Sequence, residues 1–221
     1  GYYRQIPRDT LQWHDAMFEM SWAMFRSGQF FRSALSNFHT LHSPYYEKTY
    51  SPESLLLRAI VYLYICRYDE MEKVLDLYDR IYKPVHSSIK KMLARSSSSR
   101  LYWDELKRGM ANEKKKDGDK LSLRLHDMVI LALLRENRIK SNVNYYKMLR
   151  REEVLIAQTG ASWRSSPIGK FARRIIDRRQ RSTQNLIGKL ARNYLLKMKS
   201  ELRDFFEQSD FLKFEMVSGK K

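Results

Sequence analysis

Apolar side chains recur at steps of three and four residues along nearly the whole chain, and no segment alternates polar and apolar residues over a useful length. Steps of this size place side chains on one face of an α-helix, whereas alternation with a period of two is typical of a half-buried strand. The chain has only 8 glycines and 5 prolines among 221 residues, too few for a turn-rich β-sandwich. We therefore predict an all-α fold.

Capping and turn residues divide the first 84 residues into four expected helices. Asp9 or Thr10 is the expected N-cap of the first helix, and Gly28 is its expected stop, because glycine readily adopts the backbone that ends a helix. Ser51-Pro52 marks the start of the third helix, since a hydroxyl can cap it and proline is tolerated at the first position. The apolar positions of the four helices lie within residues 13–24, 30–41, 55–66 and 71–82.

The second part of the chain, residues 85–221, is expected to be helical as well. A helix from Val85 to Gly109 precedes a polar loop over residues 113–120 and a buried apolar segment at Leu121–Asn137. A further helix is expected over Ser141–Thr159, and Gly160 is its expected stop.

The last expected helix begins at Ser166-Pro167 and reaches Glu207. Its polar stretch, Asp177–Asn185, should leave the packed surface or bend. The remaining apolar positions follow helical steps and are expected to pack inside the fold: Ile168, Phe171, Ile175, Leu186, Leu190, Tyr194, Met198, Leu202 and Phe205.

An internal repeat occupies the first 84 residues. Three segments that end in proline are alike, namely Tyr2–Pro7, Phe38–Pro44 and Tyr78–Pro84, and their prolines lie 37 and 40 residues apart. Periods of this length are typical of stacked two-helix units. Residues 1–7 therefore look like the tail of a preceding repeat.

The repeat resembles the tetratricopeptide repeat. Ser21 and Ala59 match the small residue in the first helix of that family's unit, and Phe30 and Tyr68 match its turn aromatic. The packing positions of the second helix are matched by Met71, Leu75 and Tyr78. The resemblance covers residues 1–84 and implies stacked helical hairpins that bind other proteins. The long period is similar to that of bacterial envelope assembly lipoproteins, which implies a periplasmic or cell-envelope location.

The first helix is apolar on two sides, which indicates a second contact surface. In the tetratricopeptide arrangement its second side and the matching side of the third helix would face a concave groove. The six residues expected there, and predicted to bind a partner, are Phe18, Trp22, Phe25, Leu56, Ile60 and Tyr64. Two occupants are consistent with such a groove: the chain's own C-terminal helices, or a helix or extended peptide of another protein.

The net charge of +17 lies entirely in residues 85–221. This part of the chain is expected to cap the helical stack and to recruit an acidic partner through its basic clusters. The five arginines singled out for an anionic partner are Arg173, Arg174, Arg178, Arg179 and Arg181. Nucleic acid is the main alternative to a protein partner, and an anionic membrane face is a third. The longest apolar run, Met128–Leu134, is far shorter than the roughly 20 residues that span a bilayer.

Motifs of nucleophilic catalysis, phosphate-binding glycine loops and paired zinc-type cysteines do not occur in the sequence. His39 and His42 lie three residues apart, but the sequence offers no third ligand beside them, so we predict neither a metal site nor a cofactor. Cys66 has no partner for an internal disulfide and is expected to be buried as a small apolar residue. The sequence therefore favours a protein-binding scaffold without enzymatic activity, with nucleic-acid binding as the alternative.

Overall fold

The computed structural model of the chain describes residues 2–8, 10, 12–28, 30–115, 120 and 122–220. This part of the chain contains nine α-helices, two short 3-10 helices and no strand, which confirms the all-α prediction. It divides into two compact units, one formed by Gly1–His86 with Ser200–Lys221 and the other by Ser87–Lys199. The expected boundary after Pro84 lies close to this division, but the C-terminal residues return to the first unit.

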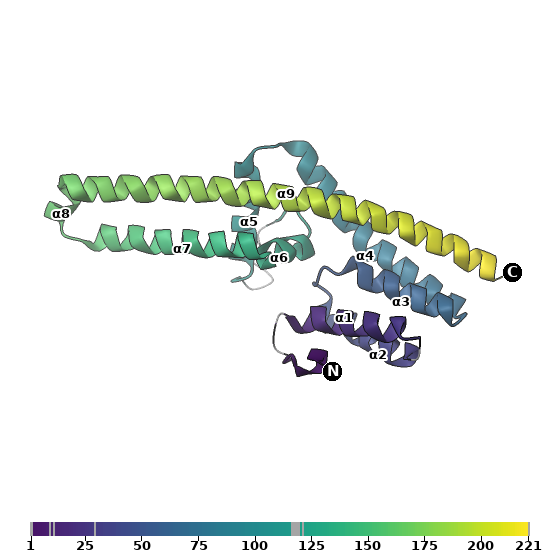
Figure 1. Ribbon diagram of the computed structural model, residues 1–221. Helices are drawn as coiled ribbons and strands as arrows, with labels where there is room; N and C mark the ends of the chain where they lie inside the picture. The colour runs from purple at the N-terminus through teal and green to yellow at the C-terminus, as the bar shows by residue number, and fades with distance from the viewer. Residues whose placement is uncertain are drawn as a thin grey trace. The chain divides into compact units, whose positions relative to one another are not determined.

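The first unit contains two helical hairpins. Helix α1 (Gln12–Arg26) pairs with α2 (Phe31–Leu41), and α3 (Pro52–Tyr64) pairs with the first part of α4 (Tyr68–Arg95) (Figure 1). Short 3-10 helices, η1 (Tyr2–Gln5) and η2 (Pro44–Tyr46), precede α1 and follow α2. Of the two expected N-caps of α1, Asp9 lies outside the described residues, and the Thr10 hydroxyl donates a hydrogen bond to the carbonyl oxygen of Pro7.

The core between these hairpins is formed by α2 and α3. Ala34, Phe38 and Leu41 of α2 pack with Leu57 and Val61 of α3, and all five are at most 3% exposed. Burial of each large apolar side chain contributes about 1.5–3 kcal/mol. The hydroxyl of Tyr82 in α4 accepts a hydrogen bond from the backbone N–H of Ser51, so α4 also fixes the start of α3.

The turn between α3 and α4 corrects the prediction for Cys66. Cys66 is exposed and has a φ of 55°, a left-handed backbone that usually belongs to glycine at the end of a helix. Its N–H donates to the carbonyl oxygen of Leu63, and the N–H of Arg67 donates to that of Tyr62. Cys66 therefore ends α3 and is not part of the core.

Helix α4 continues through Pro84, where the sequence placed a boundary, and ends at Arg95. Proline removes one backbone hydrogen bond inside a helix. Buried residues on both sides of it hold the helix together: Tyr78, Tyr82, Val85 and Ile89. The expected helix from Val85 to Gly109 is thus divided at residues 96–98, and α5 (Ser99–Asn112) begins after this break.

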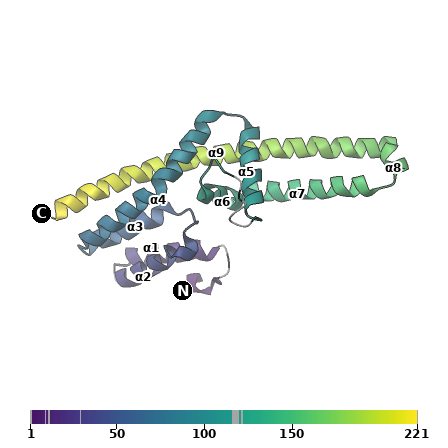
Figure 2. The ribbon, with the colours of Figure 1, turned by 180° about the vertical axis from the view of Figure 1, so that it is seen from behind.

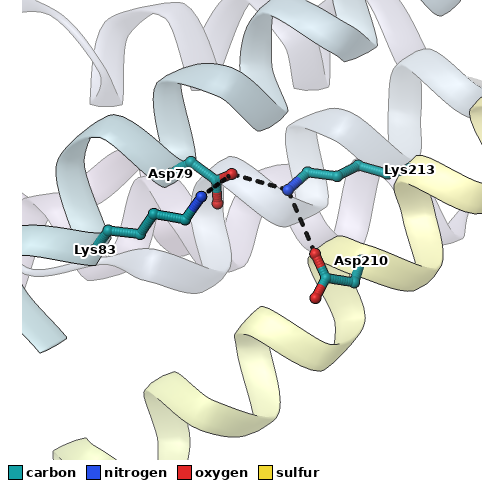
Figure 3. A network of polar contacts seen from close by, with 4 residues as sticks. All are labelled: Asp79, Lys83, Asp210 and Lys213. Carbon is teal, nitrogen blue, oxygen red and sulfur yellow. Dashed lines mark hydrogen bonds and ion pairs between the residues drawn. The ribbon is translucent and has the colours of Figure 1, made fainter.

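The C-terminal end of helix α9 (Pro167–Gly219) packs on α4 and extends twelve residues beyond its expected end at Glu207. The ring of Phe206 meets that of Tyr78 edge-on, with centroids 5.3 Å apart. Beside it, a carboxylate oxygen of Asp79 accepts hydrogen bonds from Lys83 at 2.8 Å and from Lys213 at 2.9 Å (Figure 3). Burial alone would raise the pKa of the Asp79 carboxyl, but these two hydrogen bonds hold it below its ordinary value.

The second unit is built around the pairing of α7 (Asn137–Gln158) with the first part of α9, which run side by side in opposite directions (Figures 1 and 2). The unit also contains α5, α6 (Asp127–Arg135) and the short α8 (Ala161–Ser165). Helix α7 begins four residues before the expected Ser141, because the Glu136 side chain caps it by accepting from the N–H of Ile139. Of the expected loop at 113–120, residues 116–119 lie outside the described part of the chain.

Helix α6 lies in the segment predicted to be buried, of which Leu121 is outside the described residues. Its Met128, Val129, Ile130 and Leu133 are at most 4% exposed. The chain just before α6 is held by Glu105 of α5, which is fully buried. The Glu105 carboxylate accepts from the N–H of Arg124 and, at 3.0 Å, from the N–H of Leu125.

The polar stretch of α9 is the clearest correction to the sequence analysis. Asp177–Asn185 was expected to leave the packed surface or bend, but Gln180 and Thr183 are buried within the unbroken helix. The Gln180 amide donates to the Glu153 carboxylate at 2.9 Å, and the Gln184 amide donates to the Tyr146 hydroxyl at 3.2 Å. Polar side chains that find partners on α7 can thus be buried without a large free-energy cost.

Gly188 allows α9 to lie against the start of α5. A methyl group at this position would overlap the carbonyl oxygen of Ser99. We expect Gly188→Ala to lower the free energy of unfolding by about 1–3 kcal/mol, because a backbone segment has to move. Urea unfolding followed by circular dichroism measures this change.

Gly160→Ala is the matched control for this prediction. A Cβ at Gly160 would lie 3.9 Å from the nearest atom, the Ser162 Oγ, and the backbone there has φ −60° and ψ 150°. We expect its effect to be within about 0.5 kcal/mol. Equal unfolding midpoints for the two variants would contradict the close approach of α9 and α5.

Candidate functional site

Four aromatic rings gather where α1 and α3 end and α2 begins, and we call them the aromatic cluster: Trp22, Phe25, Phe31 and Tyr64. Phe25 lies at its centre, with ring centroids 5.7 Å from Trp22, 5.9 Å from Phe31 and 5.2 Å from Tyr64. Phe31 and Tyr64 also stack, at 6.3 Å. Aromatic pairs of this kind contribute about 0.5–1.5 kcal/mol each beyond the area that they bury.

The six residues predicted to bind a partner differ in their exposure. Phe18, Trp22, Phe25 and Ile60 are half-buried, whereas Tyr64 is 67% exposed. Leu56 is only 2% exposed and lies in the interior of the unit, so it does not line an open groove. Three of the six, Trp22, Phe25 and Tyr64, belong to the aromatic cluster.

Phe31 is the member of the cluster that the sequence analysis missed. The spacing predicts the neighbouring Phe30 as the apolar position of the second helix, but Phe30 is 51% exposed. Phe31 packs on α1 and Tyr64 instead. Helical spacing does not show which of two adjacent phenylalanines faces the neighbouring helix. The start of α2 decides it, because Phe31 is the first residue of the helix and Phe30 lies just before it.

Two arginines lie next to the aromatic cluster in the sequence. Arg26 and Arg32 directly follow Phe25 and Phe31, and both are exposed. A partly exposed apolar surface of this kind, with charged groups at its edge, is typical of an interaction site. The arrangement suits a segment that offers an apolar side chain to the rings and a carboxylate to the guanidinium groups.

The five arginines predicted to contact an anionic partner are all exposed on α9. Arg174, Arg178 and Arg181 lie within about 60° of one another around the helix, as its 3.6-residue period requires. Arg173 and Arg179 point away from this arc. Within the described part of the chain, none of the five guanidinium groups forms an ion pair.

Two hollows lie beside these arginines in the second unit. The larger has a volume of about 620 Å³, and its wall includes Arg181 together with Arg100, Trp103 and Lys107. The smaller, of about 310 Å³, is lined by Arg164, Lys170, Arg173 and Arg174. The second hollow therefore offers four cations and no carboxylate to a ligand.

His42 forms a partly buried polar contact just after the end of α2. His42 follows α2, and its Nε2 lies 2.8 Å from the Ser54 Oγ. Because the Ser54 hydroxyl donates its proton to the carbonyl oxygen of Ser51 at 2.7 Å, the His42 ring is the donor in this contact. Burial and the nearby Arg58 lower the pKa of His42 to about 3, so its ring is neutral at pH 7. Among the residues that the structure describes, no three His, Cys, Asp or Glu side chains are placed to share a metal ion.

The neutral His42 ring makes the first unit sensitive to acid. The folded protein binds this proton near pH 3 and the unfolded chain near pH 6.5, so stability falls as the pH drops below about 6.5, by up to about 1.4 kcal/mol per pH unit. We expect His42→Gln to lose about 2 kcal/mol less than the parent between pH 7 and pH 5. Urea unfolding at pH 7, 6 and 5 measures the difference.

His39→Gln is the control for the acid effect, since His39 is exposed. Its stability should decrease with falling pH nearly as that of the parent does. A parallel decrease in the parent and in both variants would show that the His42 ring does not remain neutral in the folded protein.

Comparison with known proteins yields no relative: no family model, no curated protein and no solved structure matches this chain.

Proposed function

We propose that the protein is a non-enzymatic helical scaffold of the tetratricopeptide type that binds another protein through the aromatic cluster. The observation that carries this proposal is the cluster itself: Tyr64 is 67% exposed, yet it closes a set of four rings drawn from three helices. A rigid aromatic surface of this kind loses little side-chain entropy when it binds a partner.

Packing within the hairpins supports the tetratricopeptide type. Ser21 and Ala59, the two small residues that match the family, are both fully buried. Met71, Leu75 and Tyr78, which match the packing positions of the second helix, are at most 1% exposed. These residues are buried at the positions where stacked hairpins of that family require contact.

The partner that best suits the aromatic cluster is a segment of another protein with an apolar side chain flanked by acidic residues. The rings would take the apolar side chain, and Arg26 and Arg32 would face the carboxylates. A role in the assembly of a bacterial cell envelope is part of this proposal and rests on the repeat resemblance alone.

Photo-crosslinking tests the proposal directly. A benzophenone amino acid at position 64 in the full chain, expressed in the source cell, should yield a discrete crosslinked protein. The control carries the same amino acid at position 45, because Tyr45 is 86% exposed but lies outside the aromatic cluster. Trp22→Ala should reduce the crosslink at position 64 by about tenfold, since one good ring contact is worth about 1.4 kcal/mol.

Identical crosslinked products at positions 64 and 45 would contradict the proposal, as would a product at position 64 that Trp22→Ala leaves unchanged. Circular dichroism of Trp22→Ala separates loss of binding from loss of fold.

Nucleic-acid binding is the second candidate function, and the exposed arc of Arg174, Arg178 and Arg181 favours it. Such binding would weaken steeply with salt, because each phosphate contact releases counterions. An absence of binding to generic DNA and RNA at low salt would eliminate this candidate.

A further inference from the structure

We propose that the tip of the α7–α9 hairpin, residues 154–174, docks on an anionic lipid membrane surface. The tip consists of the end of α7, the short α8 and the first turns of α9, which lie together at one end of the hairpin (Figures 1 and 2). This proposal concerns the second unit and is independent of the function proposed for the aromatic cluster.

The tip exposes an unusual amount of apolar surface. Five large apolar side chains are between 38% and 71% exposed there: Val154, Leu155, Trp163, Ile168 and Phe171. The helical spacing predicts that Ile168 and Phe171 pack inside the fold, but the buried face of this part of α9 passes through other residues: Ile176, Ile187, Ala191 and Leu195. The apolar side chains at the start of the helix are thus left facing solvent.

Positive charge accompanies these apolar groups. Residues 154–174 contain four basic residues and no acidic one. All four basic residues line the hollow of about 310 Å³: Arg164, Lys170, Arg173 and Arg174. The Arg164 guanidinium is held in place by a hydrogen bond of 2.7 Å from its Nη1 to the carbonyl oxygen of Ala157. Phosphate groups of lipids have the charge and the acceptor oxygens that such a cluster requires.

The tip is fixed by local packing. Gly169 is buried against α8, and a methyl group on it would overlap the carbonyl oxygen of Trp163. The Ser166 hydroxyl donates to that same carbonyl at 2.6 Å and accepts from the N–H of Gly169 at 3.1 Å. Trp163 and Arg164 are therefore held against the first turn of α9, and these contacts fix their positions at the tip.

The combination of groups favours a membrane over nucleic acid or an acidic protein. Aliphatic side chains such as Leu155 and Ile168 cannot stack on bases, but they can enter the boundary between headgroups and acyl chains. Tryptophan prefers this boundary, and arginine and lysine bind the headgroups. Within the described residues, none of the helices could cross a bilayer, so the proposed contact is with the surface.

Vesicle co-sedimentation of the full chain tests the proposal. Vesicles of phosphatidylcholine with 30% phosphatidylglycerol should bind the protein, and vesicles of phosphatidylcholine alone should bind it at least tenfold more weakly. Ile168→Ser with Phe171→Ser should weaken binding to the anionic vesicles about tenfold or more, because two inserted side chains are lost. Lys170→Gln with Arg174→Gln should have a similar effect, which added salt should diminish.

The matched control is Phe211→Ser with Phe214→Ser, since these phenylalanines of the same helix are 61% and 67% exposed but lie outside the tip. This pair should bind anionic vesicles as the parent does. The proposal would be overturned if the Phe211/Phe214 variant lost as much vesicle binding as the Ile168/Phe171 variant. It would also be overturned if the parent protein did not bind anionic vesicles at low salt. Binding of the parent to DNA or RNA but not to vesicles would overturn it as well, in favour of nucleic acid.

Discussion

The first unit depends on the contact between α4 and the C-terminal end of α9. The buried residues of α4 lie on one face of the helix, and this face meets both the start of α3, through Tyr82, and the end of α9, through Tyr78: Met71, Val74, Leu75, Tyr78, Tyr82 and Val85. Phe206 packs on the rings of Tyr78 and His86, so the end of α9 covers part of this face. The Asp79 carboxylate beside these rings is shared by Lys83 and Lys213, so its burial does not leave an unpaired charge. A chain segment far away in sequence thus completes the core of the hairpins.

The sequence predicted the helices well because their apolar spacing is regular, but it could not predict which contacts outweigh local signals. Proline normally disfavours a helix interior, yet the buried side chains of Tyr78, Tyr82, Val85 and Ile89 around Pro84 keep α4 intact. Cys66 occupies a left-handed position that sequence rules assign to glycine. In α9 the buried face includes Thr183 and Gln180, and the partner of Gln180, Glu153 on α7, cannot be inferred from the sequence of α9 alone. The apolar stripe was consequently assigned to the wrong side of the helix in its first turns.

The sequence likewise predicted only some of the residues of the candidate sites. Trp22, Phe25 and Tyr64 could be singled out because they lie on the second apolar side of their helices, whereas Leu56 shares that pattern and is buried. Phe31 was not predicted because it is the first residue of α2, where spacing does not distinguish it from the adjacent Phe30. The apolar and basic tip could not be found from spacing, since Ile168 and Phe171 follow the periodicity of a buried face. The two surfaces are thus one proposed site for a protein and one proposed site for a lipid surface, each on its own unit.

Hydrogen–deuterium exchange of Phe206→Ala in the full chain tests most directly whether the end of α9 completes the first unit. The account predicts faster exchange of amides in residues 71–85 and 203–216, with unchanged exchange in residues 139–156 of α7. Phe211→Ala, which removes a ring that is 61% exposed, should leave all three regions unchanged. Unaltered protection of residues 71–85 in Phe206→Ala would contradict the account, because α4 would then be stable without its cover.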